Sequence, residues 1–399
     1  MAEILTIAMA VSLLTALLLA VRWGNSVCTG PMPVSFFTFI AILFTSGLDV
    51  GLIMFPLVDF EVYATEVEYG FANPLAVEFG FWGFLVWVFY FLTTFYFCIV
   101  EPKLKLFEIP AIKLTNNIVI IGTCAFTAYL FLMYLPDYIQ GISEPFRYGL
   151  VGTVILFATL SSTDIKYVRI LSVSSTWLFF ALIASVWLVS GMGVSGLLNS
   201  MTGIGAYFSN IHRFMSPITE YHQFYLYWWF AWSIMIGQFV ARFIGGIPAW
   251  KLLLALLIVP SVPIAIWFSV LYYYFSNGLE VGTFWRLAMV VVGVIFVINS
   301  LDSLIRLYTQ NLNVTTERFG RVQYVAGNWF ALSALVILYK FTPLKIEWIG
   351  LIVIGIYVSI YWLVLQRRQQ LVQRPTSRTI YLLYRICAKY SRPRPGKYR

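Results

Sequence analysis

The sequence predicts an all-α membrane protein, arranged as an inverted repeat of five plus five helices with one extra helix at the N-terminus. Of its 399 residues, 60% are hydrophobic and only 11% are charged, whereas soluble domains carry about 25% charged residues. Its apolar stretches are long enough to cross a bilayer as helices, which takes about 20 residues. Its lysine and arginine residues are distributed unevenly between alternate loops.

Eleven stretches are long and apolar enough to be membrane spans. The loops between them are short, so no segment is large enough for a separate soluble catalytic domain, and we expect no enzyme. The predicted spans are residues 3–22, 34–58, 77–99, 117–137, 146–163, 168–190, 220–242, 251–275, 281–306, 322–340 and 346–366.

A less hydrophobic segment, residues 191–219, divides the chain and is rich in glycine and serine. We expect it to form a connector with a short helix along the membrane interface. Five spans precede it within residues 34–190, and five follow it within residues 220–366. An odd number of helices in each half inverts the second half relative to the first, which is the arithmetic of an inverted repeat. Residues 1–33 then form a peripheral helix, and residues 367–399 form a tail.

The orientation follows from the basic residues. Glu3 precedes the first span and Arg22 follows it, the reverse of a secretory signal, so we expect a retained helix with its N-terminus outside. Eleven spans then place the C-terminus in the cytoplasm. The basic residues of the loops test this orientation: 21 of the 26 fall on the cytoplasmic side, as the positive-inside rule requires. The net charge of +9 therefore reflects loop asymmetry rather than a surface for nucleic acid. Four acidic residues are expected in one external loop: Asp59, Glu61, Glu66 and Glu68.

The tail carries ten of these basic residues and no acidic one. A solvated, flexible terminus is one interpretation. Adhesion to anionic lipids is the other, worth about 1 kcal/mol for each basic residue near the surface. The expected location is the inner membrane of a bacterium.

Neither a metal site nor a cofactor site is predicted. The four cysteines, Cys28, Cys98, Cys124 and Cys387, form no Cys-x-x-Cys motif, and the chain has only two histidines. These spacings indicate neither a zinc site nor a disulfide framework, and they do not suit a haem.

Two acidic residues lie within predicted spans, where an ionised carboxylate should face a cavity, a partner or an ion. Asp302 lies four residues before Arg306, so the two side chains share a helix face and we expect a structural ion pair. Asp49 has no basic neighbour in its own helix and lies between Gly47 and Gly51, where the helix is expected to be interrupted. Asp49 is either a proton carrier or a neutral acid that hydrogen-bonds to freed backbone groups.

Two sets of aromatic residues could bind a cation. Trp228 and Trp232 share a face of the seventh predicted span, with Trp229 beside them. Trp82, Trp87 and Tyr90 lie in the third. Aromatic belts at the membrane interface are the alternative explanation, but Trp87, Tyr90 and Trp232 lie well inside their spans. Aromatic faces attract a quaternary ammonium group, at about 0.5–2 kcal/mol per ring.

The aromatic run of the seventh span resembles the signature helix of the betaine, choline and carnitine transporter (BCCT) family. Three other segments resemble that family in the same order, and together they cover most of residues 34–366. The matching residues are Phe224-Tyr225-x-x-Trp228-Trp229-x-x-Trp232-x-x-x-x-Gly237-x-Phe239-x-Ala241-Arg242, Phe44-x-x-Gly47-x-x-x-Gly51-Leu52 with the later Asp59, Trp82-Gly83 with Trp87 and Tyr90, and Phe296-x-x-Asn299-Ser300-x-Asp302-Ser303.

The resemblance implies a LeuT-like bundle, often a homotrimer, that transports a small quaternary ammonium compound by alternating access. It places the trimethylammonium group in a box formed by Trp82, Trp87, Tyr90, Trp228, Trp229 and Trp232. It also implies an ion site, suited to sodium, between the backbone near Leu48 and the side chains of Asn299 and Ser300, with Phe296 close by. Structural or gating roles are expected for Gly47, Gly51, Arg242, Asp302 and Arg306.

The sequence also departs from the family pattern. The family usually has twelve spans, so this chain is a shortened member. Asp49 replaces a small residue, Asn299 stands where sodium-coupled members usually carry a hydroxyl, and Ile234 replaces a proline. These changes favour proton coupling through Asp49 over sodium coupling. They also motivate an alternative function, a sensor or membrane scaffold that is derived from a transporter and moves no substrate.

Overall fold

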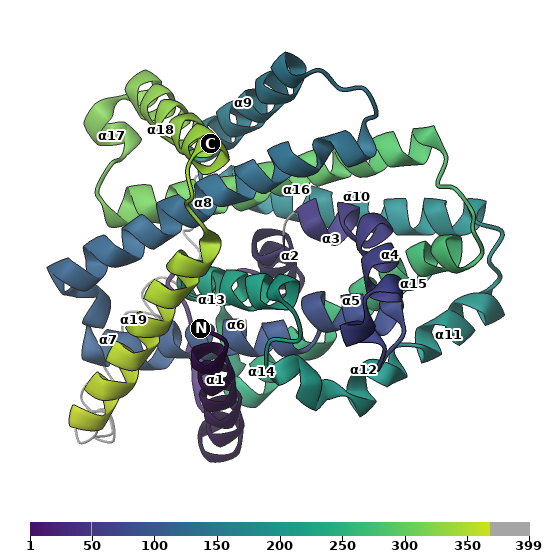
Figure 1. Cartoon of the computed structure of the whole chain (residues 1–399). Helices are drawn as coiled ribbons and strands as arrows, with labels where there is room; N and C mark the ends of the chain where they lie inside the picture. Colours follow the sequence, from purple (N-terminus) through teal and green to yellow (C-terminus); the bar gives the residue numbers. More distant parts are fainter. Residues whose placement is uncertain (49, 368–399) are drawn as a thin grey trace, which may run out of the picture.

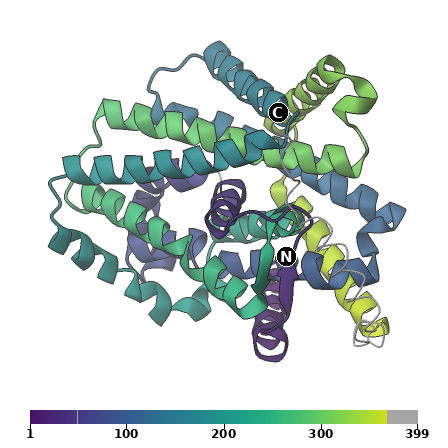
Figure 2. The same ribbon diagram turned by 180° about the vertical axis from the view of Figure 1, so that it is seen from behind.

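The computed structural model describes residues 1–48 and 50–367, and this part of the chain is almost entirely helical (Figures 1 and 2). Eight of its helices are long and apolar enough to cross a membrane, which confirms an all-α membrane protein. They are Ala2–Trp23, Pro74–Leu104, Pro110–Tyr138, Lys166–Val189, Ala249–Ser276, Thr283–Asn311, Arg321–Phe341 and Ile346–Gln366. The three other predicted spans are helical as well but shorter or less apolar, so the number eleven is not confirmed.

The second predicted span is broken, as its glycines indicate. Helix α1 (Ala2–Trp23) and the short strand β1 (Val27–Thr29) precede it. Helix α2 (Phe36–Gly47) begins at the N-cap Ser35, whose side chain accepts a hydrogen bond from the N–H of Thr38, and it ends at Leu48 in extended backbone. Helices α3 (Val50–Met54) and α4 (Pro56–Thr65) follow. The helix is therefore interrupted after Gly47, and the next helix begins at Val50.

The third predicted span is also divided. Asn73 caps α5 (Pro74–Trp82), which stops at Gly83, and α6 (Leu85–Phe95) starts after Phe84. Phe84 has a φ of +45°, a conformation that costs free energy in a non-glycine residue. Its N–H donates a hydrogen bond to Ser261 Oγ at 3.1 Å, which ties this break to a second one in the chain, between α14 (Ala249–Ile258) and α15 (Ser261–Ser276).

The remaining elements are long helices together with short helices, single turns and one short strand. A one-turn 3₁₀ helix, Val67–Tyr69, follows α4, and a π-helical turn, Tyr96–Val100, follows α6. Strand β2 pairs antiparallel with β1. The other bounds are α7 (Glu101–Leu104), α8 (Pro110–Tyr138), α9 (Glu144–Ser161), α10 (Lys166–Val189), α11 (Val194–Thr202), α12 (Gly205–Ser209), α13 (Glu220–Val240), β2 (Gly245–Pro248), α16 (Thr283–Asn311), α17 (Thr316–Phe319), α18 (Arg321–Phe341) and α19 (Ile346–Gln366), with 3₁₀ turns at Leu106–Glu108, Ile211–Met215 and Ala241–Phe243.

Equivalent helices of the two halves make equivalent contacts. Helices α8 and α16 lie side by side along the bundle (Figures 1 and 2). In the first half α2 packs against α10, and in the second half α13 packs against α19. Helix α9 contacts α16, and α18 contacts α8. Two equivalent halves of five spans give this pattern, which supports the inverted repeat, while the boundaries 34–190 and 220–366 stay a prediction.

Helix α13 lies in the middle of the bundle (Figure 1) and packs against α2, α6, α8, α16 and α19. Its contact with α6 depends on Gly237, because a Cβ atom there would lie 2.2 Å from the side chain of Thr93. A side chain at residue 237 would therefore force the two helices apart. The close approach brings the aromatic residues of α13 to the interior, where the bilayer does not reach them.

Two details of the sequence prediction were wrong. Asp59 was expected in an external loop, but it lies on α4 and is only 3% exposed. The chain is helical again in α3 and α4, and α4 turns Asp59 toward tyrosine hydroxyl groups inside the bundle. The connector 191–219 contains two short helices, α11 and α12, and a 3₁₀ turn rather than a single short helix. The predicted tail is residues 367–399, of which residues 368–399 lie outside the described part of the chain.

Candidate functional site

Three of the predicted tryptophans converge in the bundle interior. Trp82 is the last residue of α5, and its ring meets those of Trp228 and Trp229 from α13. The ring centroids of Trp82 lie 5.7 Å from Trp228 and 5.2 Å from Trp229, with interplanar angles of 81° and 80°. Trp228 and Trp229 are themselves parallel. We call these three residues the tryptophan cluster; it forms two perpendicular aromatic walls.

The broken span runs directly beside the tryptophan cluster. A Cβ atom on Gly51 would lie 2.5 Å from the ring of Trp82, a distance that real side chains do not tolerate. Glycine at this position therefore permits the backbone of α3 to approach the indole ring. The predicted interruption and the two aromatic helices thus meet at one place in the fold.

The other aromatic residues of the predicted box are buried near this place but make different contacts. Trp87 and Tyr90 on α6 pack edge to face at 5.3 Å, and the hydroxyl of Tyr90 donates a hydrogen bond to the carbonyl of Gly47 at 2.9 Å. Trp232 is buried on α13. Within the described part of the chain, no ring contact joins Trp87 or Trp232 to the tryptophan cluster. A single box of all six rings therefore stays a prediction.

The residues of the predicted ion site surround the end of α2. The hydroxyl of Ser300 on α16 donates to the carbonyl oxygens of Leu48 and Thr45, at 3.0 and 3.3 Å. Asn299 Nδ2 donates to Thr45 Oγ1 at 2.6 Å, and Ser172 of α10 donates to Asn299 Oδ1. Carbonyl, hydroxyl and amide oxygens are the ligands that hard cations prefer. The structure thus brings Leu48, Asn299 and Ser300 together.

Two further predicted residues belong to the same region. Phe296 packs edge to face against Phe44 of α2 at 6.1 Å, one helical turn from Asn299, and shields the oxygen atoms from the apolar side. Asp49, the predicted proton carrier, lies outside the described residues, so its role stays a prediction.

The predicted ion pair between Asp302 and Arg306 is confirmed. The two side chains are buried and lie 2.9 Å apart. Ser161 Oγ donates to Asp302 at 2.8 Å, and Arg306 donates to the carbonyls of Ser161 and Asp164 at 3.0 and 3.1 Å. The pair therefore ties α16 to the turn between α9 and α10. A gating role for it stays a prediction.

Arg242 lies in the turn after α13, and its guanidinium donates to the side-chain oxygen of Gln310 near the end of α16. This contact links the ends of the two helices that carry the aromatic and the ion-site residues. Arg242 is thus placed to couple their movements, a role that the structure leaves as a prediction.

The sequence reasoning missed a pair of buried acids. Glu78 on α5 is fully buried, one helical turn before Trp82, and Tyr63 Oη donates to Glu78 Oε2 at 2.8 Å. Asp59 Oδ2 accepts from Tyr221 at 3.0 Å. The signal for Glu78 was present, because it is an acidic residue inside the predicted span 77–99. An acidic residue within a membrane span is energetically costly and therefore indicates a functional site.

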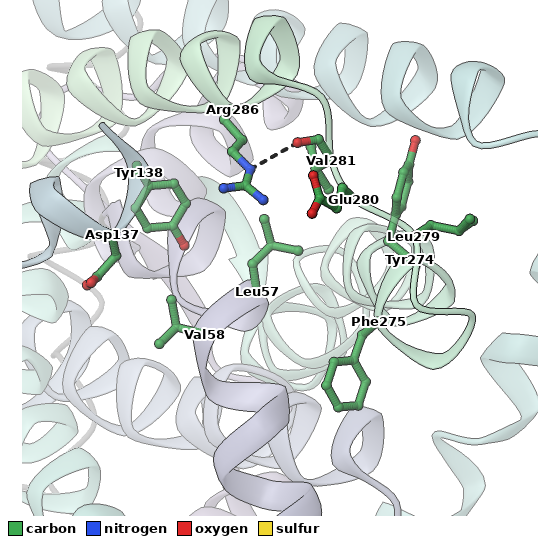
Figure 3. A pocket seen from close by; sticks show the side chains of 10 residues that line it. All are labelled: Leu57, Val58, Asp137, Tyr138, Tyr274, Phe275, Leu279, Glu280, Val281 and Arg286. Atoms are coloured by element: carbon green, nitrogen blue, oxygen red, sulfur yellow. Dashed lines mark hydrogen bonds between the residues drawn. The ribbon is translucent and has the colours of Figure 1, made fainter. Parts of the chain in front are cut away.

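Two cavities lie next to these groups. The larger, which we call the aromatic cavity, has a volume of about 500 Å³ and reaches Tyr221 and Phe224 of α13. Phe224 in turn packs on Trp228 of the tryptophan cluster at 5.6 Å. The smaller cavity, about 200 Å³, is bounded by side chains from α4, α8 and α15 and by Arg286, whose Nε donates to the carbonyl of Val281 (Figure 3). Asp137 borders both cavities.

Comparison with known proteins agrees with this arrangement. Residues 120–274, which include α13 and its tryptophans, match the family model described as BCCT, betaine/carnitine/choline family transporter. This part of the chain is similar to that transporter family. The resemblance predicted from the sequence is thereby confirmed, and the family is one of transporters rather than enzymes.

Two curated proteins that are similar to this chain are transporters by name. An uncharacterized transporter of Haemophilus influenzae is 27% identical over 279 residues, which cover 59% of this chain and 42% of that protein. The glycine betaine transporter OpuD of Bacillus subtilis is 24% identical over 277 residues, which cover 58% of this chain and 53% of that protein. The chain thus spans about half the length of the curated relatives it matches.

Among solved structures, a Na⁺-coupled sialic acid symporter in a substrate-bound outward-open state is similar to this chain. It has 15% sequence identity and a TM-score of 0.49, and the likeness covers 88% of this chain and 84% of that one.

Proposed function

We propose that this BCCT relative is a secondary active transporter of a small quaternary ammonium compound, such as glycine betaine, choline or carnitine. The observation that carries the proposal is the convergence of Trp82 with Trp228 and Trp229, 5.2–5.7 Å apart, beside the broken helix α2–α3. Perpendicular aromatic walls suit a trimethylammonium group, which attracts ring faces and donates no N–H hydrogen bond. A broken helix at mid-membrane is typical of transporters with inverted repeats.

Substrate binding requires the tryptophan cluster to open. The rings of Trp82, Trp228 and Trp229 touch one another, so the space between them does not admit a trimethylammonium group. Movement of α5 relative to α13 separates Trp82 from its two partners. The aromatic cavity, which reaches Phe224 beside Trp228, provides the approach to this opening. Alternating access then consists of opening the cluster first to one side of the membrane and then to the other.

The coupling ion is a proton or sodium. The oxygen atoms of Thr45, Leu48, Asn299 and Ser300 support a cation site where α2 and α16 meet. A cation at this place favours one arrangement of the broken helix over the other, and so biases the side on which the cluster opens. Asp49, one residue beyond Leu48 in the sequence, is the candidate proton carrier at the same site.

The setting in the membrane is part of the proposal. The N-terminus lies outside and the C-terminus lies in the cytoplasm of a bacterial inner membrane, with 21 of 26 basic residues on the cytoplasmic side. Residues 367–399 adhere to anionic lipids, and the protein assembles as a homotrimer, as the resemblance to the family implies.

The test is uptake of labelled choline and labelled glycine betaine into proteoliposomes that contain the full chain. A pH gradient and a sodium gradient are imposed separately. The proposal expects accumulation of one of the two compounds, driven by one of the two gradients, and its loss in Trp229→Leu. Trp177→Leu, which removes an exposed tryptophan of α10, is the matched control and should leave uptake unchanged. Tight binding without accumulation under either gradient would instead favour the sensor, and neither binding nor uptake would favour the scaffold.

A further inference from the structure

Two carboxylates face one tyrosine hydroxyl in the interior of the bundle. Tyr63 Oη lies 2.8 Å from Glu78 Oε2 and 3.4 Å from Asp59 Oδ2. A tyrosine has a single hydroxyl hydrogen, so it can donate to only one of the two acids at a time. If both acids were ionised, the other contact would bring together an oxygen lone pair and a carboxylate. This geometry therefore favours a state in which one of the two acids carries a proton.

The groups around the two acids supply hydroxyls but no basic partner. None of the ion pairs formed by the described residues includes Asp59 or Glu78. Two like charges without a cation in a buried site are costly, and uptake of a proton removes that cost. The titratable groups that face them are Tyr63 of α4, Tyr69 of the following 3₁₀ turn, Tyr134, Asp137 and Tyr138 of α8, and Tyr221 and Tyr225 of α13. The indole of Trp82, which does not titrate, also faces Glu78. His222 of α13 stacks on Phe81 and accepts from the N–H of Ile218.

Two polar atoms beside the acids have no hydrogen-bond partner. Glu78 Oε1 and the indole N–H of Trp82 are both buried, one helical turn apart on α5. The indole group faces Glu78 without reaching hydrogen-bond geometry. An unpaired carboxylate oxygen in an apolar interior is costly when it is charged and far less so when its carboxyl group is neutral. The unpaired oxygen is thus a second, independent sign that a proton resides here.

A hydrogen-bonded route connects the acids to the aromatic cavity. Tyr221, which lines that cavity, donates to Asp59 Oδ2 at 3.0 Å, and Tyr63 continues from Asp59 to Glu78. Asp59 lies on α4, which is not among the helices long enough to cross the membrane, and burial raises its pKa to about 7. A carboxyl group with such a pKa both gains and loses a proton near neutral pH.

We propose that Asp59 and Glu78 together bind one exchangeable proton, which enters from the aromatic cavity and is released during the transport cycle. An O–H bond forms on one carboxylate when a hydronium ion in the cavity gives up a proton and becomes water, and the same bond breaks when the carboxyl group returns the proton to a water molecule. No electron transfer is involved. The release of the proton during a transport cycle rests on the proposed function, whereas the proton site itself does not. It assigns proton coupling to this pair rather than to Asp49 alone.

The position of Glu78 explains how protonation of the pair affects the substrate site. Trp82 of the tryptophan cluster follows Glu78 by one turn of α5, so both side chains lie on the same face of the helix. A negative charge on Glu78 attracts the positive edge of the indole and a nearby cation, whereas a neutral Glu78 does not. Protonation of the pair therefore changes the field at Trp82, where the quaternary ammonium group is expected to bind.

The first test measures the proton without any substrate. Infrared spectra of the purified full chain are recorded over a pH titration, and the carbonyl band of a protonated carboxyl group is followed. The wild-type protein should show a band near neutral pH that disappears as the pH rises. The double variant Asp59→Asn/Glu78→Gln should lack that band, and each single variant should lose it at lower pH because the like charge is gone.

Two matched variants keep the assignment specific. Glu61→Gln removes an exposed acid from the same helix as Asp59, and Asp49→Asn removes the other candidate carrier. Both should retain the band with an unchanged midpoint. A band that persists in the double variant, or that is lost in Asp49→Asn, overturns the proposal. Thermal unfolding of each variant shows whether it is folded.

The second test measures coupling. In proteoliposomes, an imposed pH gradient should drive labelled choline or glycine betaine into wild-type vesicles, and the double variant should lose this drive at least about tenfold while still binding the compound. Uptake that follows the pH gradient equally in the double variant overturns the coupling role. If wild-type vesicles accumulate neither compound, the proposed transport function fails, and the infrared titration still decides whether the pair binds a proton.

Discussion

The hydroxyl of Ser300 donates a hydrogen bond to the backbone carbonyl of Leu48, 3.0 Å away. Leu48 is the residue at which α2 ends, and carbonyl groups at the end of a helix have no partner within it. Ser300 also donates to the carbonyl of Thr45 one turn earlier. Helix α16 therefore satisfies the carbonyl groups that the broken helix exposes, and the break depends on a side chain from the other half of the chain.

Ser300→Ala should destabilise the fold. The substitution removes the only hydroxyl hydrogen of Ser300, which the buried carbonyls of Leu48 and Thr45 share, and an unsatisfied buried group costs about 1–3 kcal/mol. We expect a lower unfolding temperature of the purified protein, measured by the loss of soluble protein on heating in detergent. Ser174→Ala is the control, because this exposed hydroxyl of α10 bonds to carbonyl groups of its own helix, those of Ile170 and Leu171. Equal unfolding temperatures for the two variants would contradict the role of Ser300.

Gly51→Ala should weaken substrate binding without removing any side chain of the tryptophan cluster. The added Cβ would lie 2.5 Å from the ring of Trp82, so the ring has to leave the position from which it forms one wall of the site. Displacing one aromatic wall loses about 0.5–2 kcal/mol of cation attraction, which corresponds to a rise of about twofold to thirtyfold in the dissociation constant.

Calorimetric binding of choline and glycine betaine checks the effect of Gly51→Ala. Gly149→Ala on α9 adds the same methyl group where no atom lies within 4 Å, so it should bind like the wild type. The assigned site is wrong if both alanine variants bind with the wild-type constant.

Asp302→Asn should be strongly destabilising. It leaves the buried guanidinium of Arg306 without its charged partner, and breaking a buried ion pair in this way costs about 3–5 kcal/mol. The double variant Asp302→Asn/Arg306→Gln should recover part of the loss, because no unpaired charge remains. Unfolding temperatures of the three proteins measure this difference.

The exposed pair Lys105–Glu108 provides the comparison for the buried one. Glu108→Gln should change the free energy of unfolding by less than about 1 kcal/mol, because water and salt screen charges at the surface. A similar effect of Glu108→Gln and Asp302→Asn would mean that burial does not strengthen the pair.

Much of the fold was predictable because it follows from local pattern. The length and hydropathy of the stretches indicate helices, and the glycines at residues 47 and 51 indicate the break in the second span. The lengths of apolar runs did not reveal the division between α5 and α6. Phe84 adopts its positive φ there because tertiary contacts such as the one with Ser261 stabilise the turn, and no local signal in the sequence predicts such a contact.

The candidate site was predictable only in part, for a similar reason. The spacing on α13 places Trp228 and Trp229 together, and the family resemblance adds Trp82. The approach of α5 and α6 to α13 decides which rings touch. Because the chain breaks at Phe84, Trp82 packs against Trp229 whereas Trp87 packs against Tyr90. Asp59 was misplaced because three acidic residues follow it closely in sequence and suggest solvent, whereas three tyrosines from two helices bury it.

Asp49→Gly should change substrate preference or coupling. A carboxylate in the interruption can act as counter-ion for choline, which is a cation, whereas the carboxylate of glycine betaine disfavours a negative charge nearby. We expect the glycine variant to prefer glycine betaine relative to choline more than the wild type does, by about tenfold if one ion pair is lost. Competition between the two labelled compounds in proteoliposomes measures the ratio. An unchanged ratio together with unchanged pH dependence would make Asp49 a structural residue.

Asp59 should make the protein less stable as the pH rises. Burial raises the pKa of Asp59 from an ordinary value of 3.8 to about 7, so the folded protein holds this proton more tightly than the unfolded chain does. The stabilisation from the bound proton is complete below the unfolded pKa and is lost progressively as the pH rises toward and through 7. The unfolding temperature of the wild type should therefore fall over this interval relative to that of Asp59→Asn, whose amide does not titrate. Glu61→Gln, an exposed change on the same helix, should follow the wild-type curve, and parallel curves for the wild type and Asp59→Asn would show that Asp59 is not protonated in the folded protein.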